Sequence, residues 1–144
     1  MTTPPIPTLS INATRVADVV AAVRHAVPGL VALYAFGSRV RGDAAPGSDL
    51  DLALLAPAPL DALVRFALQE TLATFAGCDV DLVDLRAATA VMRAQVYASD
   101  QLLFEGDAYA RQRFEMLALS DYARLNEERR QILDDVAQRG TVLS

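Results

Sequence analysis

The sequence contains one cysteine and one histidine, and each of these low counts excludes a class of chemistry. A single cysteine, Cys78, can form neither an internal disulfide nor a cysteine-based zinc cluster, and we expect it to be a small buried hydrophobe before a strand. His25 would be the only imidazole base for Ser-His-Asp or Cys-His catalysis, but it lies in a predicted helix outside any motif. We therefore expect His25 to be a surface or packing residue.

Long apolar runs and an excess of basic charge are also missing. No apolar run reaches the length of about 18 residues that a membrane-spanning helix needs. The amino-terminal MTTPPIPTLS has neither the basic start nor the apolar core of a signal peptide, so a cytoplasmic protein without membrane contact is expected. The net charge of -5 argues against direct nucleic-acid binding by a basic surface, although it does not exclude a nucleotide bound through a metal.

The length of 144 residues suits one domain around one hydrophobic core. We expect an irregular lead-in over residues 1–12, a core over 13–106, and a helical segment over 107–144 that belongs to the same domain. Apolar spacing predicts helices over 11–27, 60–75, 87–98 and 108–138, strands over 30–36, 49–55 and 79–85, and at most a short strand over 102–104. Asn12 or Thr14 is expected to cap the first helix, and Gly77 to end the second. The strand over 30–36 is a nearly continuous apolar run, which is typical of a strand buried on both faces. These elements predict an α/β fold, with a small mixed sheet of three or four strands, helices on one side, and a long C-terminal helix.

Two of the predicted helices carry specific expectations about their surfaces. The helix over 60–75 has its predicted core positions at helical spacing: Leu63, Phe66, Ala67, Leu72 and Phe75. The long C-terminal helix carries many of the arginines of the chain on one face. That face is either a solvated helix surface or a surface for a partner or a phosphate.

The stretch GSRVRGDAAPGSDLDL, which begins at Gly37, is the candidate active site. Gly37 ends an apolar strand and allows a sharp turn with close approach of a ligand to the backbone. Ser38 opens a helical turn, whose N–H groups and positive dipole end favour an anion such as phosphate. The alternative is that Ser38 only caps that turn.

Paired carboxylates follow the turn. Asp49 and Asp51 alternate along a predicted strand, so both side chains leave the same face and can reach one divalent cation. Mg²⁺ suits them, because it takes one or two protein carboxylates and completes its octahedron with water and phosphate oxygens. Two carboxylates that only cap the start of a strand are the simpler alternative.

A third carboxylate is expected from the strand DVDLVDL, and Asp81 is the choice. An unpaired carboxylate buried inside this apolar run would be costly unless it bound a cation. Asp84 has the opposite parity and is predicted to be structural, whereas Asp79 shares the parity of Asp81 but lies near the strand start.

Gly37-Ser38, ten residues, and then Asp49-x-Asp51 resembles the signature of the DNA polymerase β-like nucleotidyltransferases. The wider string GSRVRGDAAPGSDLDLALL resembles minimal nucleotidyltransferases, the MNT proteins, and QLLFEGD followed by ARQRFEMLALSDYARL resembles the end of MNT antitoxins encoded beside a HEPN-domain toxin. The resemblance implies that Gly37 and Ser38 hold the triphosphate of ATP, while Asp49, Asp51 and Asp81 bind two Mg²⁺ ions, with Asp81 nearest the attacking hydroxyl.

Three more residues complete the nucleotide-binding candidates: Arg39, Arg41 and Ser48. The two arginines follow Ser38 and could reach phosphates or the partner, or could simply be exposed charges. The resemblance implies an adenylyltransferase that moves AMP from ATP to a tyrosine hydroxyl of a HEPN ribonuclease toxin. The alternatives are transfer to a small-molecule hydroxyl, as on an aminoglycoside, and an antitoxin that acts by binding alone.

Overall fold

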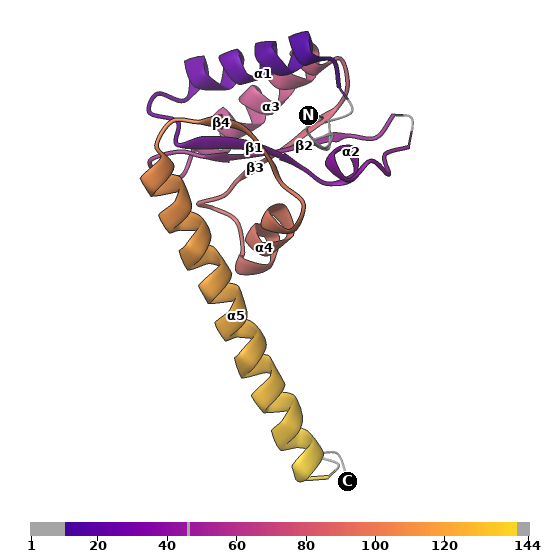
Figure 1. Ribbon diagram of the computed structural model, residues 1–144, viewed down its shortest axis with the longest axis vertical. Coiled ribbons are helices and arrows are strands. Elements are labelled where there is room, and N and C mark those ends of the chain that lie inside the picture. The colour runs from indigo at the N-terminus through magenta and orange to yellow at the C-terminus, as the bar shows by residue number, and fades with distance from the viewer. Residues whose placement is uncertain (1–10, 46, 141–144) are drawn as a thin grey trace, which may run out of the picture.

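The computed structural model describes residues 11–45 and 47–140 (Figure 1). The predicted lead-in lies outside these ranges except for its last residues. Helices and strands follow one another in the order α1 (Ala13–Ala26), β1 (Ala32–Phe36), α2 (Ser38–Arg41), β2 (Leu50–Leu55), α3 (Ala62–Ala76), β3 (Val80–Asp84), α4 (Ala90–Ala98), β4 (Gln101–Glu105) and α5 (Ala108–Gln138). Within the described ranges, no helix is both long and apolar enough to cross a membrane.

Side-chain caps explain where the helices begin. Each capping oxygen accepts a hydrogen bond from a backbone N–H of the first turn, which would otherwise lack an intrahelical partner. The caps are Asn12 for α1, Asp61 for α3, Thr89 for α4 and Asp107 for α5. The cap at Asn12 was one of two predicted candidates for α1.

The four strands form one mixed sheet in the order β3-β2-β1-β4. β1 pairs antiparallel with both β2 and β4, and β2 pairs parallel with β3 across the α3 crossover. β4 is a full strand rather than the short one predicted, and its ladder with β1 is irregular between Leu33 and Tyr34. The mixed α/β prediction is confirmed.

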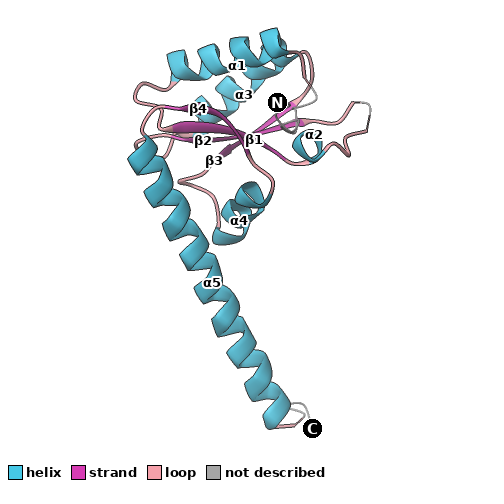
Figure 2. Cartoon of the chain, in the orientation of Figure 1, coloured by secondary structure: helices cyan, strands magenta, loops and turns pink. Residues whose placement is uncertain are grey.

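Helices cover both faces of the sheet, so the prediction of helices on one side is wrong (Figure 2). α1 and α3 pack on the face formed by Leu33, Leu52 and Leu82. α4 and the start of α5 pack on the other face, against Tyr34 and other strand residues. The physical reason is that β1 is buried along its whole length on both faces, and such a strand needs a layer on each side.

The predicted core face of α3 is partly wrong. Leu68, Leu72 and Ala76 are its buried residues, whereas Leu63 is 80% exposed and Phe66 is 55% exposed. Apolar residues occur all around this helix, so periodicity alone could not select the face that packs on α1 and the sheet.

α5 is the feature that reaches farthest from the sheet. It begins under the strands and then extends away from the rest of the fold (Figure 1). Its first turns are fixed to the body by Arg111, which pairs with Glu105 of β4, and by Phe114, whose ring lies 5.0 Å from the Arg93 guanidinium carbon. The 31-residue helix has only Ala118 fully buried.

Candidate active site

The turn between β1 and β2 is built on Gly37. Its backbone has φ 80° and ψ −155°, a combination that is open almost only to glycine. A Cβ built at this position would collide with Oδ2 of Asp51. Glycine therefore allows the Asp51 carboxylate to lie directly against the turn that opens α2.

The register of the sheet places two of the predicted carboxylates side by side. Asp51 is paired with Asp81 across the parallel β2–β3 ladder, and with Phe36 across the antiparallel ladder to β1. Neighbouring strands lie about 4.8 Å apart, and directly paired residues project from the same face. Asp49 immediately precedes β2 with the parity of Asp51, so the three carboxylates share the face that α4 covers.

The electrostatics of the site follow from this crowding. Burial raises the pKa of Asp51, and the negative charges of Asp81 and Asp49 raise it further, while Arg41 opposes the shift. A cation placed among these oxygens would reverse that effect, because it favours the ionised carboxylates. The donor set of carboxylate oxygens is the one that Mg²⁺ prefers.

The three carboxylates do not form a preformed metal-binding cluster. Across residues 11–45 and 47–140, no group of three or more His, Cys, Asp or Glu side chains is arranged closely enough to hold a metal ion. Asp49 and Asp81 are exposed, and Asp51 is half-buried. Asp51 and Asp81 are the residues that could hold a cation, with Asp49 beside them.

Asp81 is exposed, so the prediction that it is a buried carboxylate is wrong, although its register with Asp51 agrees with its selection as the third carboxylate. β3 is an edge strand, so Asp81 projects from its half-covered face and is exposed. The buried carboxylate is Asp84, at 4% exposure, and it accepts hydrogen bonds from the backbone N–H groups of Leu60 (2.7 Å) and Arg86 (3.1 Å). The structural role predicted for Asp84 is confirmed.

A cleft of about 540 Å³ opens beside Asp51. The Gly37 N–H donates to Ser99 Oγ at 3.3 Å, which connects the turn to the end of α4. The residues that line the cleft are Phe36, Gly37, Ser38, Arg41, Asp51, Gln95, Ala98 and Ser99. The last three come from α4 and its C-terminal end, and no sequence motif indicated them. Ser99 and Gln95 come from a segment more than forty residues downstream of Asp51, and no local pattern could have found them.

The other predicted nucleotide-binding residues are connected to each other. The Arg39 guanidinium donates to the Ser48 carbonyl from Nε at 3.0 Å and from a terminal nitrogen at 2.6 Å. This contact fastens the loop before Asp49 to α2. Arg41 lines the cleft and also pairs with Asp43 at 3.3 Å.

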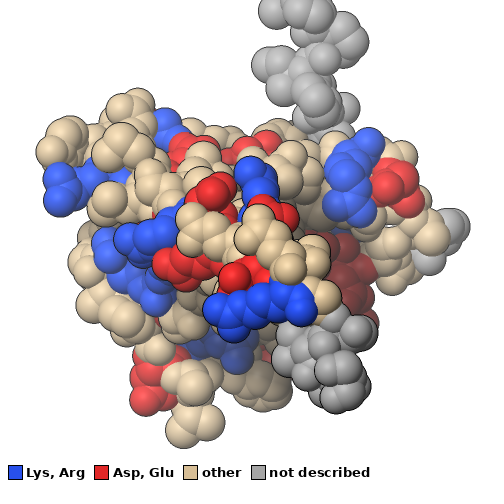
Figure 3. All heavy atoms as spheres, turned by 90° about the horizontal axis from the view of Figure 1, so that it is seen from below, with Lys and Arg blue, Asp and Glu red and all other residues tan. Residues whose placement is uncertain are grey.

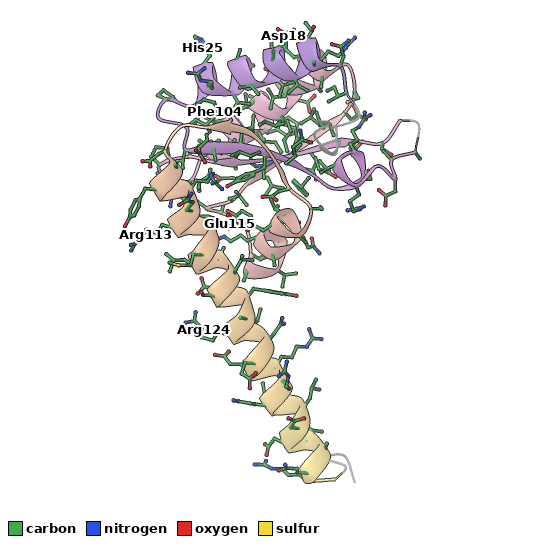
Figure 4. The ribbon with its side chains drawn as sticks, in the orientation of Figure 1. Asp18, His25, Phe104, Arg113, Glu115 and Arg124 are labelled. Carbon is green, nitrogen blue, oxygen red and sulfur yellow. The ribbon has the colours of Figure 1, made fainter. Side chains whose placement is uncertain are left out.

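A larger hollow, about 640 Å³, lies between α1 and α3 on the opposite face of the sheet. Asp18 and His25, both labelled on α1 in Figure 4, belong to its rim, and most of its lining is apolar. His25 is exposed, as expected of a surface residue. This hollow is separated from the carboxylates by the sheet, so the smaller cleft is the candidate active site.

Comparison with known proteins agrees with this geometry. Residues 22–109 match the family described as Polymerase beta, Nucleotidyltransferase, and the chain belongs to that family. Among curated proteins, it is similar to protein adenylyltransferase MntA of Shewanella oneidensis, with 39% identity over 114 residues that cover 79% of this chain and 81% of the relative. Probable protein adenylyltransferase MntA of Haemophilus influenzae is 41% identical over 80 residues, which cover 53% of this chain and 67% of the relative.

Solved structures show the same likeness. A toxin–antitoxin crystal structure with AMP-PNP contains a chain that superimposes with a TM-score of 0.76 and 36% identity, covering 85% of this chain and 98% of that one. A complex of a tri-AMPylated Shewanella oneidensis HEPN toxin with its MNT antitoxin gives a TM-score of 0.71 and 35% identity, covering 85% of this chain and 96% of the other.

Proposed function

We propose that this chain is an antitoxin that transfers AMP from ATP to a tyrosine hydroxyl of a HEPN ribonuclease toxin and thereby neutralises it. The observation that carries the proposal is the pairing of Asp51 with Asp81 beside the Gly37 turn. Support also comes from relatives named as protein adenylyltransferases and from a structural relative in complex with an AMPylated HEPN toxin. ATP and RNA are both cytoplasmic, and we place the protein in that compartment.

The residues divide the work by position. The turn at Gly37 and Ser38 binds the triphosphate in the cleft, and Arg41 supplies positive charge at its wall. Arg39 and Ser48 hold the loop before Asp49 in place, and through it they shape the nucleotide site.

Asp49, Asp51 and Asp81 would hold two Mg²⁺ ions, which supply Lewis-acid stabilisation of charge on the phosphates and activate the attacking oxygen. In the transfer, the tyrosine oxygen bonds to the α-phosphorus, the bond between the α-phosphorus and the bridging oxygen breaks, and pyrophosphate leaves. The phenolic proton passes to the Asp81 carboxylate or to water. Most of the acceleration then comes from positioning and electrostatics.

Neutralisation by binding alone is the second candidate, and it is favoured by the exposed apolar surface of α5. Transfer to a small molecule is the third. No separate acceptor-binding domain is present in the part of the chain that the structure describes, so the protein acceptor is preferred.

The decisive experiment mixes the chain with a HEPN-domain protein encoded beside it, Mg²⁺ and ATP, and weighs that protein by intact mass spectrometry. The proposal expects a gain of one or more AMP masses that disappears with Asp49→Ala and persists with Asp18→Ala, an exposed aspartate on the opposite face. Neutralisation without any mass change would instead support binding alone.

The metal assignment has its own test. Mg²⁺ relieves the repulsion around Asp51, so it should raise the melting temperature of the wild type, and Asp49→Asn should reduce that rise. An equal rise in wild type and variant, or none in either, would refute the assigned metal site without involving any acceptor.

A further inference from the structure

The face of α5 that packs against the body continues beyond it. Ala110 and Phe114 pack against the core under the sheet, and Ala118 is buried. Helical periodicity carries the same face onward to Leu125, Ile132 and Val136. In the direction of the C-terminus, the helix therefore presents its apolar side where the body no longer covers it.

The exposure of this continued face is large. Leu125 is 42% exposed, Ile132 64% and Val136 43%. A single exposed apolar residue needs no explanation, but a stripe with this period along a projecting helix is typical of a surface that receives another helix.

One flank of the stripe carries three acidic residues, two of which pair with arginines of the same helix. Asp121, Glu128 and Asp135 follow one another at heptad spacing along the same edge. Arg124 and Arg139 pair with the first and last of them, at 2.9 Å and 3.3 Å. Figure 3, seen from below, shows acidic and basic side chains around tan atoms in its centre.

This charge pattern selects the kind of occupant. Two copies of the helix packed antiparallel would bring the edges that carry these acidic residues against each other, and Glu128, which no arginine of the helix pairs with in the described ion pairs, would then face acidic residues of the second copy, which is unfavourable. A helix with an apolar stripe and a basic edge complements the surface in both respects. The pattern therefore favours another protein over a second copy of this chain.

The stripe is also connected to the catalytic face. A hollow of about 410 Å³ lies between Ala90, at the start of α4, and the α5 residues Leu125 and Glu128. A second hollow, of about 400 Å³, runs from the adjacent Thr89 to Asp81. Thr89 and Ala90 are adjacent in the chain, so the start of α4 lines both the hollow beside α5 and the hollow beside Asp81.

We propose that the distal half of α5, residues 119–138, is the docking surface for the protein that accepts AMP. A partner helix with an apolar stripe and a basic edge lies along Leu125, Ile132 and Val136, and the acceptor segment reaches Asp81 across the start of α4. The identity of the partner as an AMP acceptor rests on the proposed function, whereas the docking surface does not depend on the chemistry.

The test compares the double substitution Ile132→Ser and Val136→Ser with Gln131→Ser and Gln138→Ser, which lie on the opposite side of the same exposed turns. Binding to the adjacent HEPN-domain protein is measured by calorimetry, and AMP transfer by mass spectrometry under varied toxin concentration. The first double variant should weaken binding and raise the KM for the toxin by about tenfold or more, with ATP affinity and kcat at saturating toxin unchanged. The second should stay within about twofold of wild type. Glu128→Arg should weaken binding and reduce its dependence on salt.

The outcomes separate docking from catalysis. Transfer by the wild type with an unchanged KM in Ile132→Ser/Val136→Ser would overturn the docking surface and leave the proposed function intact. Binding without transfer, lost in the same variant, would overturn the function and support the docking surface. A wild type that neither binds nor modifies the toxin would overturn both.

Discussion

Replacing Gly37 with alanine tests the link between the backbone turn and the catalytic carboxylate. The φ and ψ of Gly37 fall in a region that other residues enter only at a cost of about 1–3 kcal/mol. The added methyl group also occupies the position of Asp51 Oδ2, so either the turn or the carboxylate must move. The substitution should therefore damage both stability and catalysis.

Gly42→Ala is the matched control, because Gly42 also has positive φ but a Cβ built there meets no atom within 4 Å. Its cost is conformational strain alone, about 1 kcal/mol in the left-handed region. At about 4 °C per kcal/mol for a chain of this size, Gly42→Ala should lower the melting temperature by about 4 °C and Gly37→Ala by about 4–12 °C.

The assay combines thermal melting with the rate of AMP transfer at a temperature where both variants are folded. Gly37→Ala should lose about 100-fold or more in kcat, because a displacement of about 1 Å at a catalytic group can have this effect. Gly42→Ala should lose little activity. If both variants transfer AMP at the wild-type rate, the close approach of Asp51 to the turn has no catalytic role.

Further predictions concern three aspartates and the loop before them. Asp81→Asn should abolish AMP transfer with little change in melting temperature. Asp84→Ala should lower the melting temperature, at about 1–3 kcal/mol for each backbone N–H left unpaired, and any residual folded protein should keep activity. The pKa of Asp51 is raised in the fold, so the folded state favours the protonated carboxyl group. In metal-free buffer, the stabilisation that protonated Asp51 contributes is therefore fully present below the ordinary carboxyl pKa and is lost as the pH rises through the raised pKa. Asp51→Asn should therefore flatten this loss and raise the melting temperature near neutral pH; an unchanged pH profile would contradict it. Arg39→Ala should free the Ser48 loop, and faster proteolysis there, with a raised KM for ATP, would show it.

The parts of the fold that the sequence predicted correctly are those determined by neighbouring residues. The cap at Asn12, the stop of α3 at Gly77 and the turn at Gly37 each depend on a few adjacent positions. Strand β1 was predicted as buried on both faces from its composition alone, and all its residues are buried. The conclusion that both faces then need helices was missed, because it concerns the sheet as a whole.

The parts that failed depend on long-range packing. Ser99 and Gln95 reach the cleft only because α4 packs under the same sheet face as Asp51. The core face of α3 is set by contacts with α1 and β3, which its own periodicity does not reveal. The face of a strand from which a side chain projects follows from the local alternation of residues. The register between two strands does not, and a slip of one residue would have turned Asp81 away from Asp51.

The two aspartates of β3 show why burial is an unreliable guide to reactivity in this strand. Asp84 is buried and tolerates burial because two backbone N–H groups satisfy its oxygens, so it has no need of a cation. Asp81 stays exposed on an edge strand and is open to a metal and an acceptor. Burying an unpaired carboxylate is costly, so a buried carboxylate must have a partner, and that partner can be a backbone N–H group instead of a cation. A carboxylate that binds a metal and receives a substrate, in contrast, has to remain accessible. The reactive carboxylate is therefore found by its register with Asp51, and the structural one by its burial.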